Sequence, residues 1–122
     1  MIGLKILSAK EFNVNLKCTI HASGKLGFTE ATASVLKLSE DSGIKFAQDD
    51  KGELYLINSQ SMDDDSFKVN KAGNYYYVNG KVLFDQLGYD YRNYNIIFDM
   101  VNVSELGNNH YKLNERKKPR KK

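Results

Sequence analysis

The stretch that decides the fold is CTIHASGKLGFTEATASVLKLSEDSGIKF, residues 18–46, together with FKVNKAGNYYYVNGKVLFDQLGYDYRNYNIIF, residues 67–98. Each segment reads as a strand, a glycine-containing turn, a second strand, a helix and a further strand. With one gap, the aligned pairs are Gly24 and Gly73, Phe28 and Tyr77, Val35 and Phe84, Leu38 and Leu87, Ile44 and Ile96, and Phe46 and Phe98. A repeated unit of this size predicts two pseudo-symmetric halves that share one core.

Local patterns place the elements of the first copy. Cys18 and Ile20 alternate with polar residues, which is typical of a half-buried strand. Thr29 is placed to cap a helix, and Glu30 puts a negative charge in its first turn. The turn sequence of residues 49–52, DDKG, lies between two apolar runs and predicts a hairpin.

The second copy contains three consecutive tyrosines. Because successive side chains of a strand point to opposite faces, Tyr75 and Tyr77 share one face and Tyr76 takes the other. We expect the pair to pack in the core and Tyr76 to face outward. Asn79 is expected to cap the following helix, which ends near Gly88.

These elements predict an α+β fold in one domain, residues 1–107, because a chain of 122 residues suits a single core. The expected architecture is a curved antiparallel sheet with two helices on one face. It is built from two pseudo-symmetric ββββα-like units, with the repeat at about 18–46 and 67–98. From residue 108 the chain is polar and basic, and we expect residues 108–122 to be a disordered tail.

The net charge of +3 is concentrated at the end of the chain. Residues 115–122, ERKKPRKK, hold six cations and one carboxylate, a net charge of +5, whereas residues 1–114 carry −2. Such a run of cations can bind phosphates without sequence specificity, or it can act only as a solubilising tail.

Several classes of function are disfavoured by the composition. The single Cys18 excludes an intramolecular disulfide, and two distant histidines are too few for a metal site. No acid, base and nucleophile converge, so we expect a protein that is not an enzyme and has no cofactor. No apolar run approaches the roughly 18–20 residues of a membrane span, and we expect a cytoplasmic protein without a membrane partner.

The expected arrangement of residues 2–101 resembles the Whirly and PUR-type superfamily of single-stranded nucleic-acid-binding proteins, which includes the positive-cofactor-four coactivators. The resemblance is architectural, with no fingerprint motif, and the first half would be circularly shifted relative to the usual order. It implies a sheet face that binds single strands of DNA or RNA through aromatic and basic side chains.

The outward positions of the expected strands and the basic tail supply such side chains. Cations there would neutralise phosphates, and rings would stack on bases. The predicted nucleic-acid-binding residues are Lys17, His21, Lys45, Tyr55, Lys68, Tyr76, Arg116, Lys117, Lys118, Arg120, Lys121 and Lys122. An ordinary solvated sheet face is the alternative reading of the same pattern.

Two other functions stay open. Residues 16–57 resemble the AbrB-type swapped-hairpin module, with a "TI" strand, a short helix ending in Leu-x-Leu and a hairpin with an acidic-glycine turn. This resemblance implies duplex-DNA binding by an intertwined dimer, although His21 stands where that family has proline and the following loop lacks the usual arginine. The second alternative is a protein–protein interaction module with a solubilising tail, for which a homodimer is one form.

Overall fold

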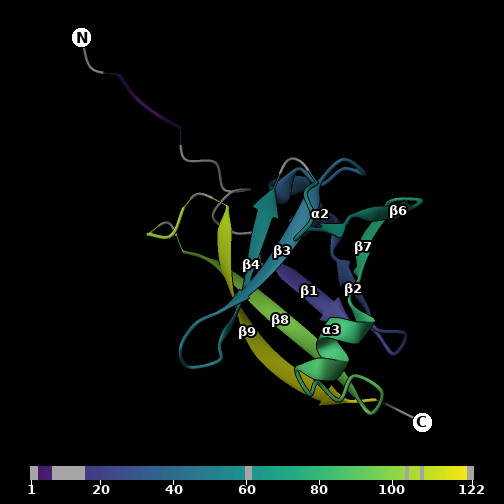
Figure 1. Cartoon of the computed structure of the whole chain (residues 1–122). Coiled ribbons are helices and arrows are strands. Elements are labelled where there is room, and N and C mark those ends of the chain that lie inside the picture. Colours follow the sequence, from purple (N-terminus) through teal and green to yellow (C-terminus); the bar gives the residue numbers. More distant parts are fainter. Residues whose placement is uncertain (1–2, 7–15, 60–61, 104, 108, 121–122) are drawn as a thin grey trace.

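Nine antiparallel strands form one sheet that curls into a nearly closed barrel (Figure 1). The computed structural model describes residues 3–6, 16–59, 62–103, 105–107 and 109–120. Its elements are β1 (Lys17–Ile20), β2 (Lys25–Phe28), α2 (Glu30–Leu36), β3 (Gly43–Gln48), β4 (Leu54–Ser59), β5 (Phe67–Lys68), β6 (Asn70–Ala72), β7 (Tyr75–Asn79), α3 (Lys81–Gln86), β8 (Tyr94–Asn102) and β9 (His110–Pro119). The strand order is β5-β3-β4-β9-β8-β1-β2-β7-β6.

One short stretch, residues 67–72, brings the two edges of this sheet together. Phe67 pairs with Ile44 of β3, whereas Asn70 pairs with Tyr77 of β7. Between them Val69 is fully buried, and its amide donates to the Ser42 carbonyl at 3.4 Å. Closing a sheet in this way removes the exposed edges that an open sheet would present.

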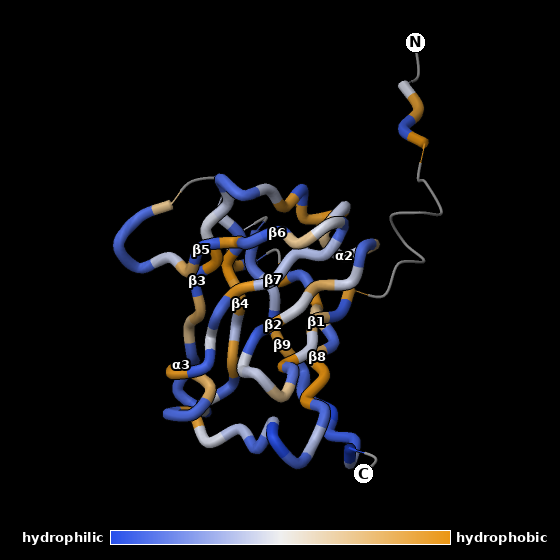
Figure 2. The backbone as a smooth tube through the Cα atoms, turned by 90° about the vertical axis from the view of Figure 1, so that its right-hand side faces the viewer, coloured by the Kyte–Doolittle hydropathy of each residue, from blue (hydrophilic) through white to orange (hydrophobic). Residues whose placement is uncertain are grey.

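The expected antiparallel sheet with two helices is present, but its arrangement differs from the prediction. The described chain is 47% strand and 12% helix, which makes the fold mainly β rather than α+β. The two helices lie toward opposite ends of the barrel and not on one face (Figures 1 and 2). Closure explains the difference, because the inner face of a barrel is filled by side chains and leaves the open ends for helices.

The element order ββαββ occurs twice, first in β1–β4 with α2 and then in β6–β9 with α3. The units exchange hairpins: β1–β2 lies between β8 and β7, and β8–β9 lies between β4 and β1. Equivalent strands meet at two seams, where β2 pairs with β7 and β4 pairs with β9. The barrel therefore has a pseudo-twofold axis, and the units are ββαββ rather than ββββα.

The residue alignment of the repeat is out of phase at its centre. Phe84 is the buried residue of α3, and Thr32, Ala33 and Leu36 are those of α2, whereas Val35, aligned with Phe84 from sequence, is 44% exposed. The second copy has two more residues between its turn glycine and its helix cap, Gly80. The sequence alignment of Ile44 with Ile96 agrees with the structure, because both residues are fully buried in equivalent strands.

The first helix begins as the sequence predicts. The Thr29 hydroxyl oxygen accepts from the Thr32 amide at 3.2 Å, which satisfies one free N–H of the helix N-terminus. The Thr32 hydroxyl oxygen in turn accepts from the Lys17 amide at 2.8 Å, so the cap also fixes α2 to β1. The second helix differs from the prediction, because Gly80 and not Asn79 is its N-cap and no side chain caps it.

The core fills the inside of the barrel with alternate residues from every long strand. Its members with no exposed surface include Cys18, Ile20, Leu26, Ile44, Leu56, Val78, Ile96 and Phe98. Burial raises the pKa of the Cys18 thiol far above its ordinary value, and the nearby Asp99 carboxylate raises it further. Cys18 is therefore a neutral packing residue, as its alternation with polar neighbours indicates.

The prediction of a disordered tail is wrong for His110–Pro119, which form β9 in the middle of the sheet. Tyr111 and Leu113 point inward and are 8% and 5% exposed. Pairing with β8 runs along the strand from Tyr111 to Pro119. Repulsion between the cations of β9 is reduced, because successive side chains of a strand point to opposite faces of the sheet. Carboxylates also lie beside several of these cations.

Candidate nucleic-acid interface

One row of directly paired residues crosses the outer face of the barrel from β7 to β9. In the register, Tyr77 pairs with Gly27, Gly27 with Thr19, Thr19 with Ile97, and Ile97 with Arg116. Residues directly opposite one another in antiparallel strands share a face, so these five side-chain positions all lie outside the barrel. Four strand spacings make this row about 19 Å long.

Three rings form a cluster beside β2, which we call the aromatic patch: His21, which directly follows β1, and Tyr75 and Tyr77 of β7. The rings of Tyr75 and Tyr77 are stacked, with centroids 5.7 Å apart and an interplanar angle of 23°. His21 lies beside Tyr75 at 6.0 Å between centroids. The Lys25 ammonium nitrogen is 4.6 Å from the centroid of the Tyr77 ring.

Gly27 allows the patch to form. A Cβ atom built on Gly27 would lie 1.7 Å from the Tyr75 hydroxyl oxygen and 2.7 Å from His21 Nε2. The missing side chain therefore lets Tyr75 lie over β2. Glycine within a strand commonly marks such a close approach.

A groove of about 420 Å³ opens beside the patch. Its walls come from β1, β2, the start of α2 and the turn before β7. The lining residues are Thr19, His21, Gly27, Phe28, Thr29, Glu30, Asn74 and Tyr75.

Five cations surround this face, and we call them the basic band: Lys17, Lys25, Arg116, Lys118 and Arg120. Arg116 donates to both carboxylate oxygens of Asp99, at 2.6 and 3.1 Å. Asp99 is also the register partner of Lys17 across the β1–β8 ladder. Among the described residues, Asp99 is the one carboxylate in an ion pair with a member of the band.

Arg120 keeps its full charge while being fixed in place. Its Nε and Nη2 donate to the Tyr91 carbonyl oxygen at 2.9 and 2.7 Å, and Nη1 donates to the Asn95 side chain. Its Nη2 also approaches the Ile20 carbonyl oxygen at 3.4 Å. Among the described residues no carboxylate is paired with Arg120 in an ion pair, so neutral acceptors hold a positive charge next to His21.

The ionisation of the patch follows from this surrounding. Burial lowers the pKa of His21 below its ordinary value of 6.5, and the Arg120 charge lowers it further. Burial raises the pKa of Tyr75, and the neighbouring Tyr77 adds to this. At neutral pH both rings are uncharged and offer flat faces beside the cations.

Tyr76 faces the opposite way from the prediction. It points inward, opposite Phe28 in the register and on the same face as the fully buried Val78, while Tyr75 and Tyr77 face outward. Val78 decides this phase, because residues two apart in a strand share a face. The apolar residue Val78 was therefore the feature of the sequence that could have predicted the orientation of the three tyrosines.

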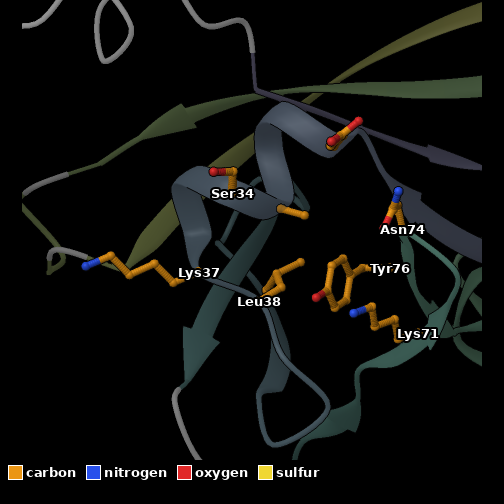
Figure 3. A pocket seen from close by; sticks show the side chains of 8 residues that line it. Ser34, Lys37, Leu38, Lys71, Asn74 and Tyr76 are labelled. Atoms are coloured by element: carbon orange, nitrogen blue, oxygen red, sulfur yellow. The ribbon is translucent and has the colours of Figure 1, made fainter.

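Tyr76 lines a second hollow, of about 300 Å³, between α2 and the β6–β7 hairpin (Figure 3). The Lys71 ammonium nitrogen lies 5.6 Å from the centroid of the Tyr76 ring, and Leu38 faces the same ring. Lys37 points away from this cluster. Glu30 and Asn74 line both hollows, so the two adjoin.

Other predicted site residues lie on β3, β4 and β5. The Lys45 ammonium is paired with Asp63 at 2.5 Å. The Tyr55 hydroxyl donates to Asp49 at 3.0 Å. Lys68 is exposed on β5 at the closing stretch. None of these three residues contributes to the patch.

The predicted cations of the C-terminal segment divide between the two faces of β9. Arg116, Lys118 and Arg120 belong to the basic band. Lys117 lies on the other face, 3.8 Å from Glu115 and with its nitrogen 5.8 Å from the centroid of the Tyr94 ring. Lys121 and Lys122 lie outside the described residues.

Five of the predicted residues belong to the aromatic patch or the basic band: Lys17, His21, Arg116, Lys118 and Arg120. Lys25, Gly27, Tyr75 and Tyr77 are not among the predicted site residues, and the fold places them beside these five. In the described parts of the chain, no group of three or more histidine, cysteine or acidic side chains could hold a metal ion. No helix in those same parts has the length and apolar character to cross a membrane.

The site has to be interpreted from this geometry. Comparison of the chain with protein-family models, with curated proteins and with solved structures found no significant match.

Proposed function

We propose that this protein binds single-stranded nucleic acid, without catalysis, on the outer face of β9, β8, β1, β2 and β7. The observation that supports this best is the placement of five cations and three rings on one continuous face. Cations of such a band neutralise phosphates, and exposed rings stack on bases at about 1–3 kcal/mol for each base. The stacking faces would be reached by unpaired bases, which favours single strands over duplexes.

A salt titration tests the proposal. Fluorescence anisotropy of a labelled single-stranded oligonucleotide should show binding that weakens steeply with salt. Neutralising four or five phosphates gives a slope of log K against log salt of about −3. Lys25→Ala and Lys118→Ala should each make this slope shallower by about 0.7.

The matched control is Lys45→Ala. Lys45 is also a strand lysine, but it is paired with Asp63 and lies outside the basic band. Its removal should leave affinity and slope unchanged. If the wild-type protein binds neither DNA nor RNA single strands at low salt, the proposal is wrong.

Duplex-DNA binding is a second candidate, and one observation favours it. The AbrB-type resemblance of residues 16–57 implies two intertwined units, and this chain contains two ββαββ units that exchange hairpins. A competition between a duplex and one of its own strands separates the candidates. Tighter binding of the duplex would support the second candidate against the first.

A further inference from the structure

We propose that the groove beside Gly27 and Tyr75 is a nucleobase slot, in which one unpaired base lies against the Tyr75 ring. This inference rests on the proposed function and deepens it, because it names the part of the ligand that enters the groove. The volume of about 420 Å³ lies within the range of about 300–1,000 Å³ that small-molecule sites occupy. Mostly apolar surface lines the groove, which suits a flat heterocycle.

The charges around the groove favour a base inside it and phosphates outside it. The Glu30 carboxylate is part of the lining and would repel a phosphate placed there. The Lys25 ammonium lies over Tyr77, and the Arg120 guanidinium lies 3.4 Å from the carbonyl oxygen of Ile20, the residue before His21. A strand that inserts a base next to Tyr75 therefore finds cations for its phosphates near the slot.

The Tyr75 wall of the slot depends on the absence of a side chain at Gly27, because the Tyr75 hydroxyl occupies the space that a Cβ would take. Thr19 and Phe28 complete the walls beside it, and the Tyr75 ring is 36% exposed and available for contact. Aromatic faces bind bases of any sequence because every base has a π-face. We therefore expect the slot to select unpaired bases over paired ones, with little preference among sequences.

The slot is expected to accept one base for each chain and not two. At the β2–β7 seam Gly27 is paired with Tyr77, so the facing position on the other unit carries a ring and not a second glycine. The two halves share architecture but not this pair of residues.

The experiment compares two probes on the same variants: a short labelled oligodeoxycytidine and an abasic backbone of the same length. Gly27→Ala places a methyl group against the end of the Tyr75 ring, which must move away. Losing one stacked base should weaken oligodeoxycytidine binding about 5- to 150-fold. Binding of the abasic backbone should not change, because it has no base to lose.

Tyr75→Ala and Tyr75→Phe test the same slot without changing the backbone. The alanine variant should lose the same factor on oligodeoxycytidine, and the phenylalanine variant should retain wild-type affinity because the ring remains. Tyr55→Ala is the matched control, since Tyr55 is a tyrosine on the outer face of β4 beyond the basic band. Thermal unfolding of each variant verifies the fold.

The outcomes separate the two proposals. If the wild type binds both probes and neither Gly27→Ala nor Tyr75→Ala weakens oligodeoxycytidine binding, the slot is wrong while the proposed function stands. If the wild type binds neither probe at low salt, the proposed function is wrong and the slot with it. The latter result is also the one expected if the groove accepts a side chain of a protein partner.

Discussion

His21 is the residue at which the chemistry of the site and the stability of the fold meet. Its ring belongs to the aromatic patch, and burial together with Arg120 holds its pKa below 6.5. A group whose pKa is lower in the folded state binds fewer protons when folded, so the unfolded state gains as the pH falls. The decrease in the free energy of unfolding that His21 causes therefore begins below about pH 6.5. It reaches its full size below the pKa that His21 has in the folded state.

We predict that His21→Gln reduces the loss of stability on mild acidification. Urea unfolding at about pH 7.5 and about pH 5.5 should show a smaller drop in the free energy of unfolding for the variant than for the wild type. The carboxylates of Asp49, Asp63 and Asp85 have pKa values below their ordinary 3.8, so their contributions are lost only at lower pH. Identical pH dependence in both proteins would contradict this assignment.

At the scale of elements, β9 shows how a strongly basic segment can be part of a core. Its inward residues Tyr111 and Leu113 are buried, and its backbone pairs with β8 over nearly its whole length. Pairing with β4 is limited to His110–Lys112, so the later part projects past β4. Lysine and arginine on such a projecting strand discourage pairing with other chains.

We predict that β9 is required for folding. A chain ending at Gly107 should lack cooperative unfolding, because both ladders of β9 and its buried side chains are lost. Leu113→Ala should lower the free energy of unfolding by about 2–5 kcal/mol through the cavity it creates. Lys118→Ala on the same strand should change it by less than about 0.5 kcal/mol. A disordered tail would make all three changes neutral, so equal stabilities would refute the role of β9.

For the whole molecule, the exchange of hairpins makes the two units interdependent. The β1–β2 hairpin has strands of the second unit on both sides, and β8–β9 has strands of the first unit on both sides. Neither ββαββ unit can therefore complete its hydrogen-bond ladders alone. An isolated hairpin of this kind is at best marginally stable in water.

We predict that a chain divided between Ser59 and Phe67 yields two fragments without a monomeric fold. Mixing the fragments should restore the barrel, because the ladders between units form without the loop. Circular dichroism, size-exclusion chromatography and amide NMR spectra of each fragment and of the mixture provide the measurement. A monomeric fragment with a dispersed spectrum would show that a unit folds alone.

The sequence by itself determined the features whose causes are local. The Thr29 cap, the hairpin at residues 49–52 and the left-handed turns at Gly24 and Gly73 depend on residues only a few positions apart. The alternation of Cys18 and Ile20 likewise shows which side of β1 is buried. Part of the candidate site was accessible in the same way, since cations and rings at alternate strand positions indicate an outer face.

Only the tertiary structure decided how the sheet closes, which tyrosines face outward and what the basic segment becomes. The pairs β1–β8 and β4–β9 join segments that are far apart in sequence, and no local pattern specifies such partners. Whether a segment like β9 is a strand depends on the ladders it enters more than on its own propensity. Gly27 and Tyr75 come together for the same reason: β2 and β7 become neighbours only when the two units interlock.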